Sequence, residues 1–466
     1  MSLNYQATRF TCSWPWTTAV LLCDGRVVCG CADPYAKRVL GDVRRTSLRE
    51  VWNGDPIASL RQDINGGGSG FCGDCPLKLP LAPDQVAPTR PAPGPLPSRL
   101  YVECTAACNI SCFQACCAPE TGITRTRQAG MLDFDLFSRV IDEAGPSLGR
   151  IDFFNYGETF LHKRAVEMCE YIKSRFPSIY LYTSTNGLAF NEDGARRLVR
   201  SGIDEVTFSI DGATPASYAR YRQRGDFDKA IRFLRLMAEE KRAAGLDVPV
   251  LNWRYILFTW NDSDEEMNLA RQVAADIGVD RLCWEITDHP EDSFSRRFVP
   301  GTPLHASIQH EIWDDNNLGN AIPGAMPRAR IQVAGGGADD FLGHLVRWLP
   351  RAPLMGRASH PLRIRTNVLN LSQRPFPATA SYGRRLVRLG AQLCAQDGTV
   401  LNRDYARAWL PDTLAGGASA EVPIEIVPPE QPGRYLLKFD LVSEGIDWFE
   451  ACGSETTMAA LWVRSP

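Results

Sequence analysis

The chain has 466 residues, a formal net charge of −3 and 44% hydrophobic residues, which predicts a globular protein of about two to four domains. It contains no long basic or acidic run, so we expect neither a nucleic-acid partner nor an anionic membrane partner. The N-terminus lacks the apolar core of a signal peptide, and no apolar run reaches the roughly 20 residues that span a bilayer, so we expect a cytoplasmic protein.

The fifteen cysteines are unevenly distributed along the chain. Six of them lie between Cys12 and Cys75, five lie between Cys104 and Cys117, and four lie elsewhere. Thiols of a cytoplasmic protein are expected to stay reduced. Buried structural cysteines would be scattered among apolar strands, so the clustering favours bound metal.

The segment 1–79 contains the first cysteine group. Its final pair, in the sequence FCGDC, has a two-residue spacing that is typical of metal ligands. Four thiolates would saturate one iron–sulfur cluster, and zinc is the alternative that this spacing allows. The candidate ligands are Cys12, Cys29 or Cys31, Cys72 and Cys75. Seven prolines in the segment 80–98 then predict an extended linker.

From residue 99 to 290 predicted strands alternate with predicted helices. Such an alternation favours a parallel sheet with outer helices, which right-handed connections curve into a barrel. We therefore predict an α/β fold with a partial (β/α)6 barrel, whose functional site lies at the carboxyl ends of the strands. The predicted strands are 99–104, 150–157, 179–187, 205–212, 248–258 and 281–286, and the predicted helices are 133–145, 163–176, 191–202, 226–245 and 263–278.

The segment 291–355 is less regular, and we predict a bridge with one or two helices there. Four sites near or within it could meet sugar hydroxyls or simply lie on the surface: His289, His305, His310 and Asp314–Asp315. From residue 356 to 466 the hydrophobic pattern has period two, which predicts a C-terminal β-sandwich. Aromatic residues of this segment could stack on sugar rings or fill the sandwich core: Trp409, Trp448 and Phe449.

The second cysteine group follows the first barrel strand, in the sequence CTAACNISCFQACC. Cys108, Cys112 and Cys116 are spaced by four residues. Three thiolates would hold an iron–sulfur cluster and leave one iron open for another ligand, unless Cys104 or Cys117 supplies a fourth. Zinc is the competing metal, but it usually takes two separated cysteine pairs.

These motifs resemble the radical S-adenosylmethionine (radical SAM) family, in the branch that carries an auxiliary-cluster domain (SPASM or twitch). The resemblance covers about 1–79 and 99–290, and it rests on motifs in the family's order at the ends of successive strands: CNISC at 108–112, NYGETFLH at 155–162, TSTNG at 183–187 and VTFSIDGATPASYARYR at 206–222. The family's usual C-x3-C-x2-C loop would place the third thiol at Ala115. Here Cys116 or Cys117 must take that place, and we favour Cys116.

The resemblance implies a [4Fe–4S] cluster that binds S-adenosylmethionine and an auxiliary [4Fe–4S] cluster in the N-terminal module. It also implies a reductant such as flavodoxin or ferredoxin. Gly157 would allow close backbone approach, and Glu158 would accept a hydrogen bond from the ammonium group of S-adenosylmethionine.

The remaining cofactor contacts are implied in the same way. Ser209 and Asp211 would meet the ribose hydroxyls, and Arg222 would pair with the carboxylate of S-adenosylmethionine. Thr185 and Asn186 would line the same opening. Each of these residues has a simpler alternative role as a polar cap of a loop or helix.

Three functions remain open at this stage. The first is hydrogen abstraction from a carbohydrate or glycosylated natural product, by an epimerase similar to oligosaccharide epimerases of the avilamycin-pathway type. Cys283 on the sixth strand would then return a hydrogen atom, although a buried apolar role is the alternative. The C-terminal segment resembles sandwich modules of bacterial glycan-pathway proteins, which favours this function. The second function is a peptide-modifying maturase, and the third is a non-catalytic iron–sulfur redox or assembly protein.

Overall fold

The computed structural model describes most of the chain as two compact units, Met1–Thr302 and Pro303–Pro466. The described residues are 9–31, 33, 35–73, 75, 77–81, 92–113, 130–287, 290–313, 328–336, 353–372, 375–378, 386–443, 447–452 and 454–465. In this part of the chain no helix is long and apolar enough to cross a membrane.

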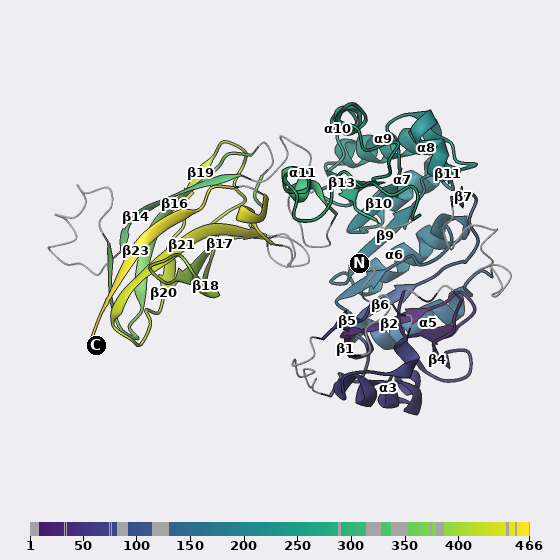
Figure 1. The fold of residues 1–466 in the computed structure, drawn as a ribbon, viewed down its shortest axis with the longest axis horizontal. Helices are drawn as coiled ribbons and strands as arrows, with labels where there is room; N and C mark the ends of the chain where they lie inside the picture. The colour runs from purple at the N-terminus through teal and green to yellow at the C-terminus, as the bar shows by residue number, and fades with distance from the viewer. Residues whose placement is uncertain are drawn as a thin grey trace. The chain divides into compact units, whose positions relative to one another are not determined.

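The first unit is built on a parallel sheet in which strands follow one another in chain order (Figure 1). Each predicted barrel strand is present, and adjacent strands pair in parallel. These strands are β6 (Arg99–Val102), β8 (Arg150–Asp152), β9 (Tyr180–Thr185), β10 (Glu205–Ser209), β12 (Val250–Ile256) and β13 (Arg281–Glu285). The predicted α/β fold with a partial (β/α)6 barrel is therefore confirmed.

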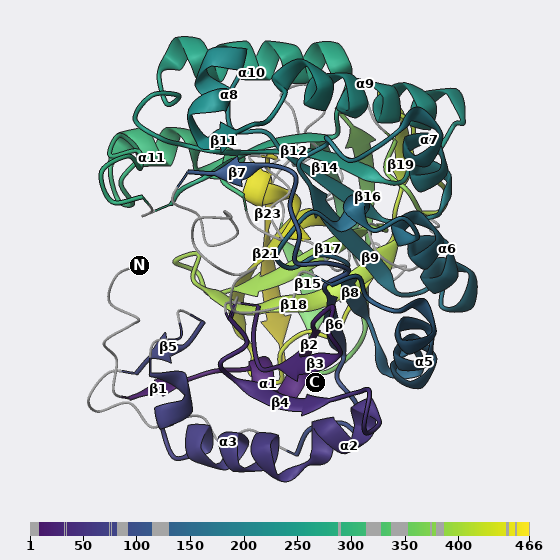
Figure 2. The same ribbon diagram turned by 90° about the vertical axis from the view of Figure 1, so that its right-hand side faces the viewer.

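Helices cover the outer side of these strands (Figure 2). They are α5 (Phe134–Ala144), α6 (Ala165–Arg175), α7 (Glu192–Arg200), α9 (Phe227–Ala243) and α10 (Asp264–Ile277). Side chains alternate across a strand, and the alternate set that faces the helices is apolar. Phe153, just after β8, packs on Phe137 of α5 with ring centroids 6.2 Å apart. The opposite set of side chains therefore lines the inner face of the barrel.

The N-terminal module extends the same sheet beyond β6. Its strand β2 (Thr18–Leu21) pairs in parallel with β6, and the antiparallel strands β3 (Arg26–Val28) and β4 (Val39–Asp42) follow. Hydrogen bonding thus continues through nine strands. The remaining module elements are β1 (Phe10–Thr11), which pairs with β5 (Leu79–Pro80), and the helices α1 (Trp14–Thr17), α2 (Leu48–Asn53) and α3 (Asp55–Asn65).

Three short elements that the pattern did not predict complete the first unit. The helix α8 (Pro215–Tyr221) follows β10, and it leads into β11 (Arg222–Gln223). This strand pairs with β7 (Ser111–Cys112) in a separate two-stranded sheet. A capping box at Thr214 and Ser217 starts α8.

The second unit begins with α11 (Pro303–Ile308) and then contains two sheets (Figure 1). One sheet consists of β14 (Ala329–Gly336), β16 (Leu362–Asn370), β19 (Ser419–Glu421) and β20 (Ile424–Ile426). The other consists of β15 (Leu354–Arg357), β17 (Val387–Cys394), β18 (Val400–Trp409), β21 (Gly433–Ser443), β22 (Asp447–Trp448) and β23 (Thr457–Arg464). Strand β14 lies in the segment 291–355 that was assigned to the bridge, and β15 begins at its end, so strand pairing in this unit starts earlier than the sequence pattern indicated.

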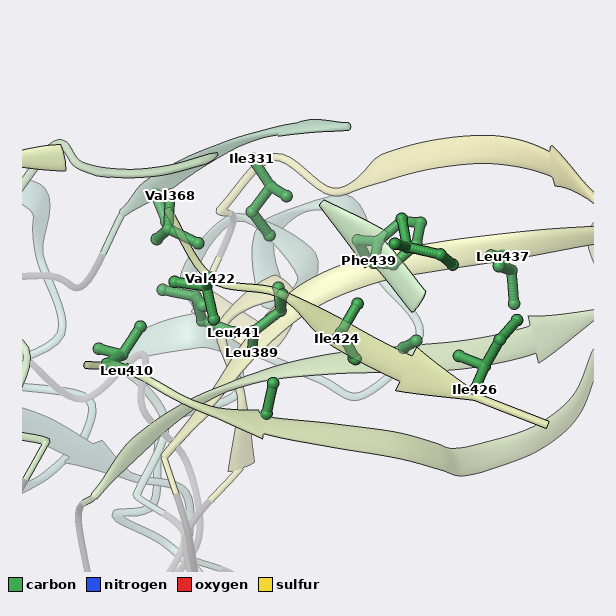
Figure 3. Packing of buried hydrophobic residues seen from close by; sticks show 14 of the residues in the cluster. Ile331, Val368, Leu389, Leu410, Val422, Ile424, Ile426, Leu437, Phe439 and Leu441 are labelled. Carbon is green, nitrogen blue, oxygen red and sulfur yellow. The ribbon is translucent and has the colours of Figure 1, made fainter. Parts of the chain in front are cut away.

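A single apolar core fills the space between the two sheets of this unit (Figure 3). Ile331 and Val368 approach from one sheet, whereas Leu389, Phe439 and Leu441 approach from the other. All five residues expose 3% or less of their surface. At about 25 cal/mol per Å² of buried apolar surface, such a core is the main stabilising term of the unit.

Candidate functional site

The cysteine loop leaves the carboxyl end of β6 and is held by a pairing far along the chain. Cys112 on β7 lies opposite Arg222 on β11, and the Phe113 N–H donates to the carbonyl of Tyr221 at 2.9 Å. Cys108 is partly exposed and Cys112 is buried. The third predicted ligand, Cys116, and its alternative Cys117 lie outside the described residues, and so does Ala115.

Gly157 places the loop after β8 directly against the cysteine loop. Its φ of +84° is in the left-handed region that favours glycine. A Cβ atom at this position would lie 2.5 Å from the carbonyl oxygen of Thr105 and 2.6 Å from that of Ala107. The next residue then donates its backbone N–H to the Ala107 carbonyl at 2.8 Å. The close backbone approach that was predicted for Gly157 is thus directed at the cysteine loop.

The Glu158 carboxylate connects the ends of β8 and β9. It is buried, and it accepts from the Thr185 hydroxyl at 2.7 Å and from the Asn186 N–H at 2.8 Å. Burial raises the pKa of Glu158, and these hydrogen bonds oppose that shift. The Asn186 amide in turn donates to Asn109 at 2.7 Å and lies 3.8 Å from the Cys108 sulfur. The contact of Glu158 with S-adenosylmethionine stays a prediction.

Arg222 and Asp211 form a buried ion pair beside the cysteine loop. The Arg222 Nε lies 2.5 Å from one oxygen of Asp211, and the Ile256 N–H donates to the other at 2.7 Å. Arg222 also places Nη1 3.4 Å from the Cys112 sulfur. Both polar groups are therefore engaged within the chain, and their predicted contacts with the carboxylate and ribose of S-adenosylmethionine remain untested.

The side chains that line the inner face of the barrel, next to the Arg222–Asp211 ion pair, are polar and charged. Ser209, Arg254 and Cys283 lie in one row across β10, β12 and β13, and the Ser209 hydroxyl is 3.2 Å from that of Ser184. Opposite charges pair throughout this face. The pairs are Arg99–Asp152, Arg150–Asp152, Arg281–Glu205 and Arg254–Glu285. In the last pair the side chains are 24% and 28% exposed, so this ion pair remains accessible to solvent.

Cys283 lies on this inner face but is completely covered. Its exposed fraction is 0%, and its thiol donates to Asn252 Oδ1 at 3.2 Å. Asn252 then donates to the Thr207 hydroxyl at 3.1 Å. Burial raises the pKa of the Cys283 thiol to about 12, so the sulfur keeps its hydrogen at neutral pH.

Four thiols of the N-terminal module line one cavity, and these are Cys12, Cys29, Cys72 and Cys75. Burial, together with smaller contributions from the nearby Cys75 and Cys12, raises the pKa of Cys72 to about 11. Among the described residues no three such side chains converge closely enough to hold a single metal ion. A set of four thiols around one enclosed space fits a four-thiolate cluster, whose assembly would release the thiol protons.

Cys31, the alternative to Cys29, does not line this cavity, although it lies close enough to Cys75 to interact with it. It packs with Val20 and Tyr101 on the inner face of the sheet. Burial raises the pKa of Cys31 to about 12; Arg99 lowers this pKa, and Asp152 raises it. The cavity lining therefore favours Cys29 as the fourth candidate ligand.

Sequence reasoning missed the charged residues around the four-cysteine cavity. Arg38, Lys78 and Asp33 line it together with the thiols, and all three are buried. Basic residues within a few positions of the cysteines were the available signal. The β7–β11 pairing was also missed, because two-residue strands carry no periodicity.

Several other sequence candidates can be placed or set aside. His289 and Asp314–Asp315 lie outside the described residues, as does the side chain of His310. Trp448 and Phe449 are buried at 4% and 1% exposure, which fits the core role. Trp409 is 54% exposed, and the Arg388 guanidinium lies 3.4 Å from its ring centroid.

Comparison with known proteins assigns families to two parts of the first unit. Residues 102–268 match the radical SAM superfamily, and residues 12–76 match the iron–sulfur cluster-binding SPASM domain. The first match contains the cysteine loop and the network of Glu158 and Arg222. The second contains all four cysteines that line the N-terminal cavity.

Individual relatives cover limited parts of the chain. A tungsten-containing aldehyde ferredoxin oxidoreductase cofactor-modifying protein of Pyrococcus furiosus is 33% identical over 114 residues, which are 24% of this chain and 30% of the relative. The mycofactocin maturase MftC of Mycobacterium tuberculosis is 29% identical over 190 residues, or 40% of this chain and 45% of the relative. This chain thus matches less than half the length of either relative.

Part of the chain also resembles solved structures. Streptococcus suis SuiB bound to S-adenosylmethionine aligns with a TM-score of 0.33 and 12% identity, over 41% of this chain and 40% of that chain.

Proposed function

Because the chain belongs to the radical SAM superfamily and carries an SPASM domain, we propose that it is an enzyme that abstracts a hydrogen atom from a polar substrate held against the inner face of its barrel. Its cofactors are a [4Fe–4S] cluster, S-adenosylmethionine and an auxiliary iron–sulfur cluster. When bound, the first two supply a 5′-deoxyadenosyl radical. The observation that carries the proposal is the convergence of Cys108 and Cys112 with Glu158, Asn186 and Arg222 at the carboxyl ends of neighbouring parallel strands.

The chain's own residues have distinct tasks in this proposal. Glu158 fixes the loop after β8 to the end of β9 through the Thr185 and Asn186 contacts. The Arg222 guanidinium, 3.4 Å from the Cys112 sulfur, stabilises the negative charge of that thiolate. A substrate would meet the accessible Arg254–Glu285 pair on the inner face.

For the substrate we propose a carbohydrate or a glycosylated natural product, with epimerisation as the reaction. The many donors and acceptors of the inner face suit hydroxyl groups, and Cys283 shares a row with Ser209 and Arg254. Its thiol would give a hydrogen atom to the substrate carbon. The resulting thiyl radical would then regain an electron from the reductant and a proton from water. Because Cys283 is fully buried, this step requires the covering side chains to move.

A peptide-modifying maturase is the second candidate. It is favoured by the similarity to the mycofactocin maturase over 190 residues. A peptide could also use the Arg254–Glu285 pair, since both charged termini and charged side chains would find a partner there. The two candidates can be distinguished by their product: an epimerase would label a glycan with deuterium, whereas a maturase would modify a peptide.

Anaerobic reconstitution tests the common part of the proposal. The reduced protein with S-adenosylmethionine should form 5′-deoxyadenosine, and the Cys112→Ala variant should form none. Cys394→Ala, which removes a buried cysteine of the sandwich, is the matched control and should keep the wild-type rate. Failure of the wild-type protein to form 5′-deoxyadenosine would overturn the enzymatic proposal.

Turnover in deuterated water distinguishes the substrates. An epimerase should incorporate one deuterium into a glycan without other mass change, and Cys283→Ala should abolish this incorporation but retain 5′-deoxyadenosine formation. Cys169→Ala, which also replaces a fully buried thiol, should behave as wild type. Modification of a precursor peptide in place of the glycan would establish the maturase function.

A further inference from the structure

A buried arginine lies near the four-cysteine cavity, and no described acidic side chain forms an ion pair with it. Arg61 on α3 is 8% exposed. Its Nε donates to the Pro15 carbonyl at 2.7 Å and its Nη1 to the Trp52 carbonyl at 3.0 Å. Its Nη2 is buried and has no hydrogen-bond partner among the described residues. The guanidinium also stacks on the Trp52 ring, 4.6 Å from the ring centroid.

An uncompensated buried cation is costly to a folded protein. Neutral carbonyl groups satisfy two of the Arg61 nitrogens, but they do not balance its charge. Burial lowers the pKa of Arg61 to about 10, and among the described residues the Cys29 side chain, when ionised, is the group that opposes this shift. Cys29 lines the cavity, so its ionisation on cluster binding would place a compensating negative charge near this cation.

The position of Arg61 on α3 also places it near the cavity. Pro15, which accepts its Nε–H, lines the cavity, and so does Ile64, which lies three residues further along α3. Residues three apart lie on the same side of a helix. Arg61 therefore lies one helical turn from a wall residue of the cavity, and its own side chain lines a second, open pocket that also contains Asp55.

Two further basic side chains would also stabilise negative charge in the cavity. Arg38 and Lys78 line it, and both are buried. Asp33 is the one carboxylate among the described residues that line it, and it accepts the backbone N–H groups of Lys37 and Arg38 at 2.9 and 2.6 Å. With Arg61, the described surroundings hold three basic side chains against one acidic side chain.

Four thiolates bound to an iron–sulfur cluster carry a net negative charge that grows by one when the cluster takes up an electron. We propose that Arg61 is a tuning residue of the auxiliary cluster, because its buried positive charge beside Cys29 favours the reduced cluster and raises its reduction potential. This inference rests on the assignment of the auxiliary cluster in the proposed function. It gives that cluster a role in holding an electron from a low-potential reductant.

An EPR-monitored redox titration of the full chain tests the inference. The Cys108→Ala/Cys112→Ala background removes the cluster that binds S-adenosylmethionine, so the signal reports the auxiliary cluster alone. In this background Arg61→Met should lower the reduced-to-oxidised ratio at a fixed potential about tenfold, which is about 59 mV for one electron. Arg61→Lys should restore most of the ratio. Arg49→Met, at an exposed position on α2, should leave it unchanged.

The same titration can overturn the inference. An unchanged midpoint potential in Arg61→Met at full iron content would show that Arg61 only holds the Pro15 and Trp52 carbonyls. If Arg61→Met fails to fold, Lys78→Met replaces it, and an unchanged potential there would equally contradict the role of the cationic surroundings. Neither result depends on turnover, so 5′-deoxyadenosine formation by the wild-type protein tests the proposed function separately.

Discussion

Arg222 and Asp211 form the charged contact that joins the cysteine loop to the carboxyl end of β10. Asp211 is completely buried, and burial raises its pKa against the opposing charge of Arg222. Replacing Arg222 by Met would leave this carboxylate buried and unpaired. We expect the free energy of unfolding of the metal-free first unit to fall by about 3–5 kcal/mol, measured by urea denaturation.

A double-mutant cycle separates the ion pair from general packing. Arg222→Met combined with Asp211→Asn should destabilise the chain by less than the sum of the two single variants, because the unpaired charge is gone. Arg220→Met, at the neighbouring exposed position where the guanidinium stacks on Trp260 at 4.5 Å, is the control. Additive losses in the cycle would contradict the coupling.

Asp440 predicts a pH dependence in the second unit. It is completely buried on β21, and burial raises its pKa from 3.8 to about 7. The folded chain therefore binds more protons at this site than the unfolded chain between about pH 4 and pH 7, so stability falls as pH rises through this window. Three pKa units set an upper limit of about 4 kcal/mol.

The Asp440→Asn variant removes this titration. The difference in thermal midpoint between wild type and variant, measured on the full chain from pH 4.5 to 8.5, should shift steadily in favour of the variant as pH rises. The Glu450 and Lys438 side chains nearby are present in both proteins, so only the part of their titration that is coupled to Asp440 enters the difference. A difference that stays constant with pH would mean that Asp440 is ionised throughout.

At the scale of elements, Gly157 decides whether the loop after β8 can approach the cysteine loop. Gly157→Ala would strain the left-handed backbone and also place Cβ 2.5 Å from the Thr105 carbonyl oxygen. We expect loss of iron from the Cys108–Cys112 site and a larger loss of stability than strain alone produces. Iron analysis after reconstitution and urea unfolding would measure the two effects.

Gly245 offers a matched control, because it also has a positive φ, +63°, but has open space where a Cβ would lie. Gly245→Ala should cost only the left-handed strain of about 1–2 kcal/mol, and it should leave iron content unchanged. Equal effects of the two substitutions would show that the backbone contact with Thr105 is unimportant for the site.

The barrel elements were predictable from the sequence because each strand and helix has its own periodicity. Strand β9 and helix α9, for example, lie within the ranges that the hydrophobic pattern indicated. The pairing of Cys112 with Arg222 was not predictable, because it joins two short strands with no pattern of their own. The choice between Cys29 and Cys31 was also out of reach, since only the folded chain shows that Cys29 lines the cavity and Cys31 packs on Tyr101.

At the scale of the whole first unit, the N-terminal module and the barrel share one sheet. Pairing of β2 with β6 satisfies the backbone groups of what would otherwise be an open sheet edge. Helix α5 adds a second connection across the same boundary. The Arg139 guanidinium donates to the Val43 carbonyl at 3.1 Å. The module is therefore held by both its sheet and its helical side.

Glu143 on α5 makes two hydrogen bonds across this boundary. Its carboxylate accepts the backbone N–H groups of Leu48 and Arg49 at 2.9 and 3.0 Å, at the first turn of α2. Because these are charge-assisted bonds to groups that lack helical partners, Glu143→Ala should lower the stability of the module by about 1–3 kcal/mol. Hydrogen exchange of the α2 amides should accelerate accordingly. The neighbouring Asp142→Ala removes a carboxylate whose bonds within the described part of the chain go to Tyr171 and Arg175 on α6. Equal acceleration in that variant would mean that Glu143 does not hold the module to the barrel.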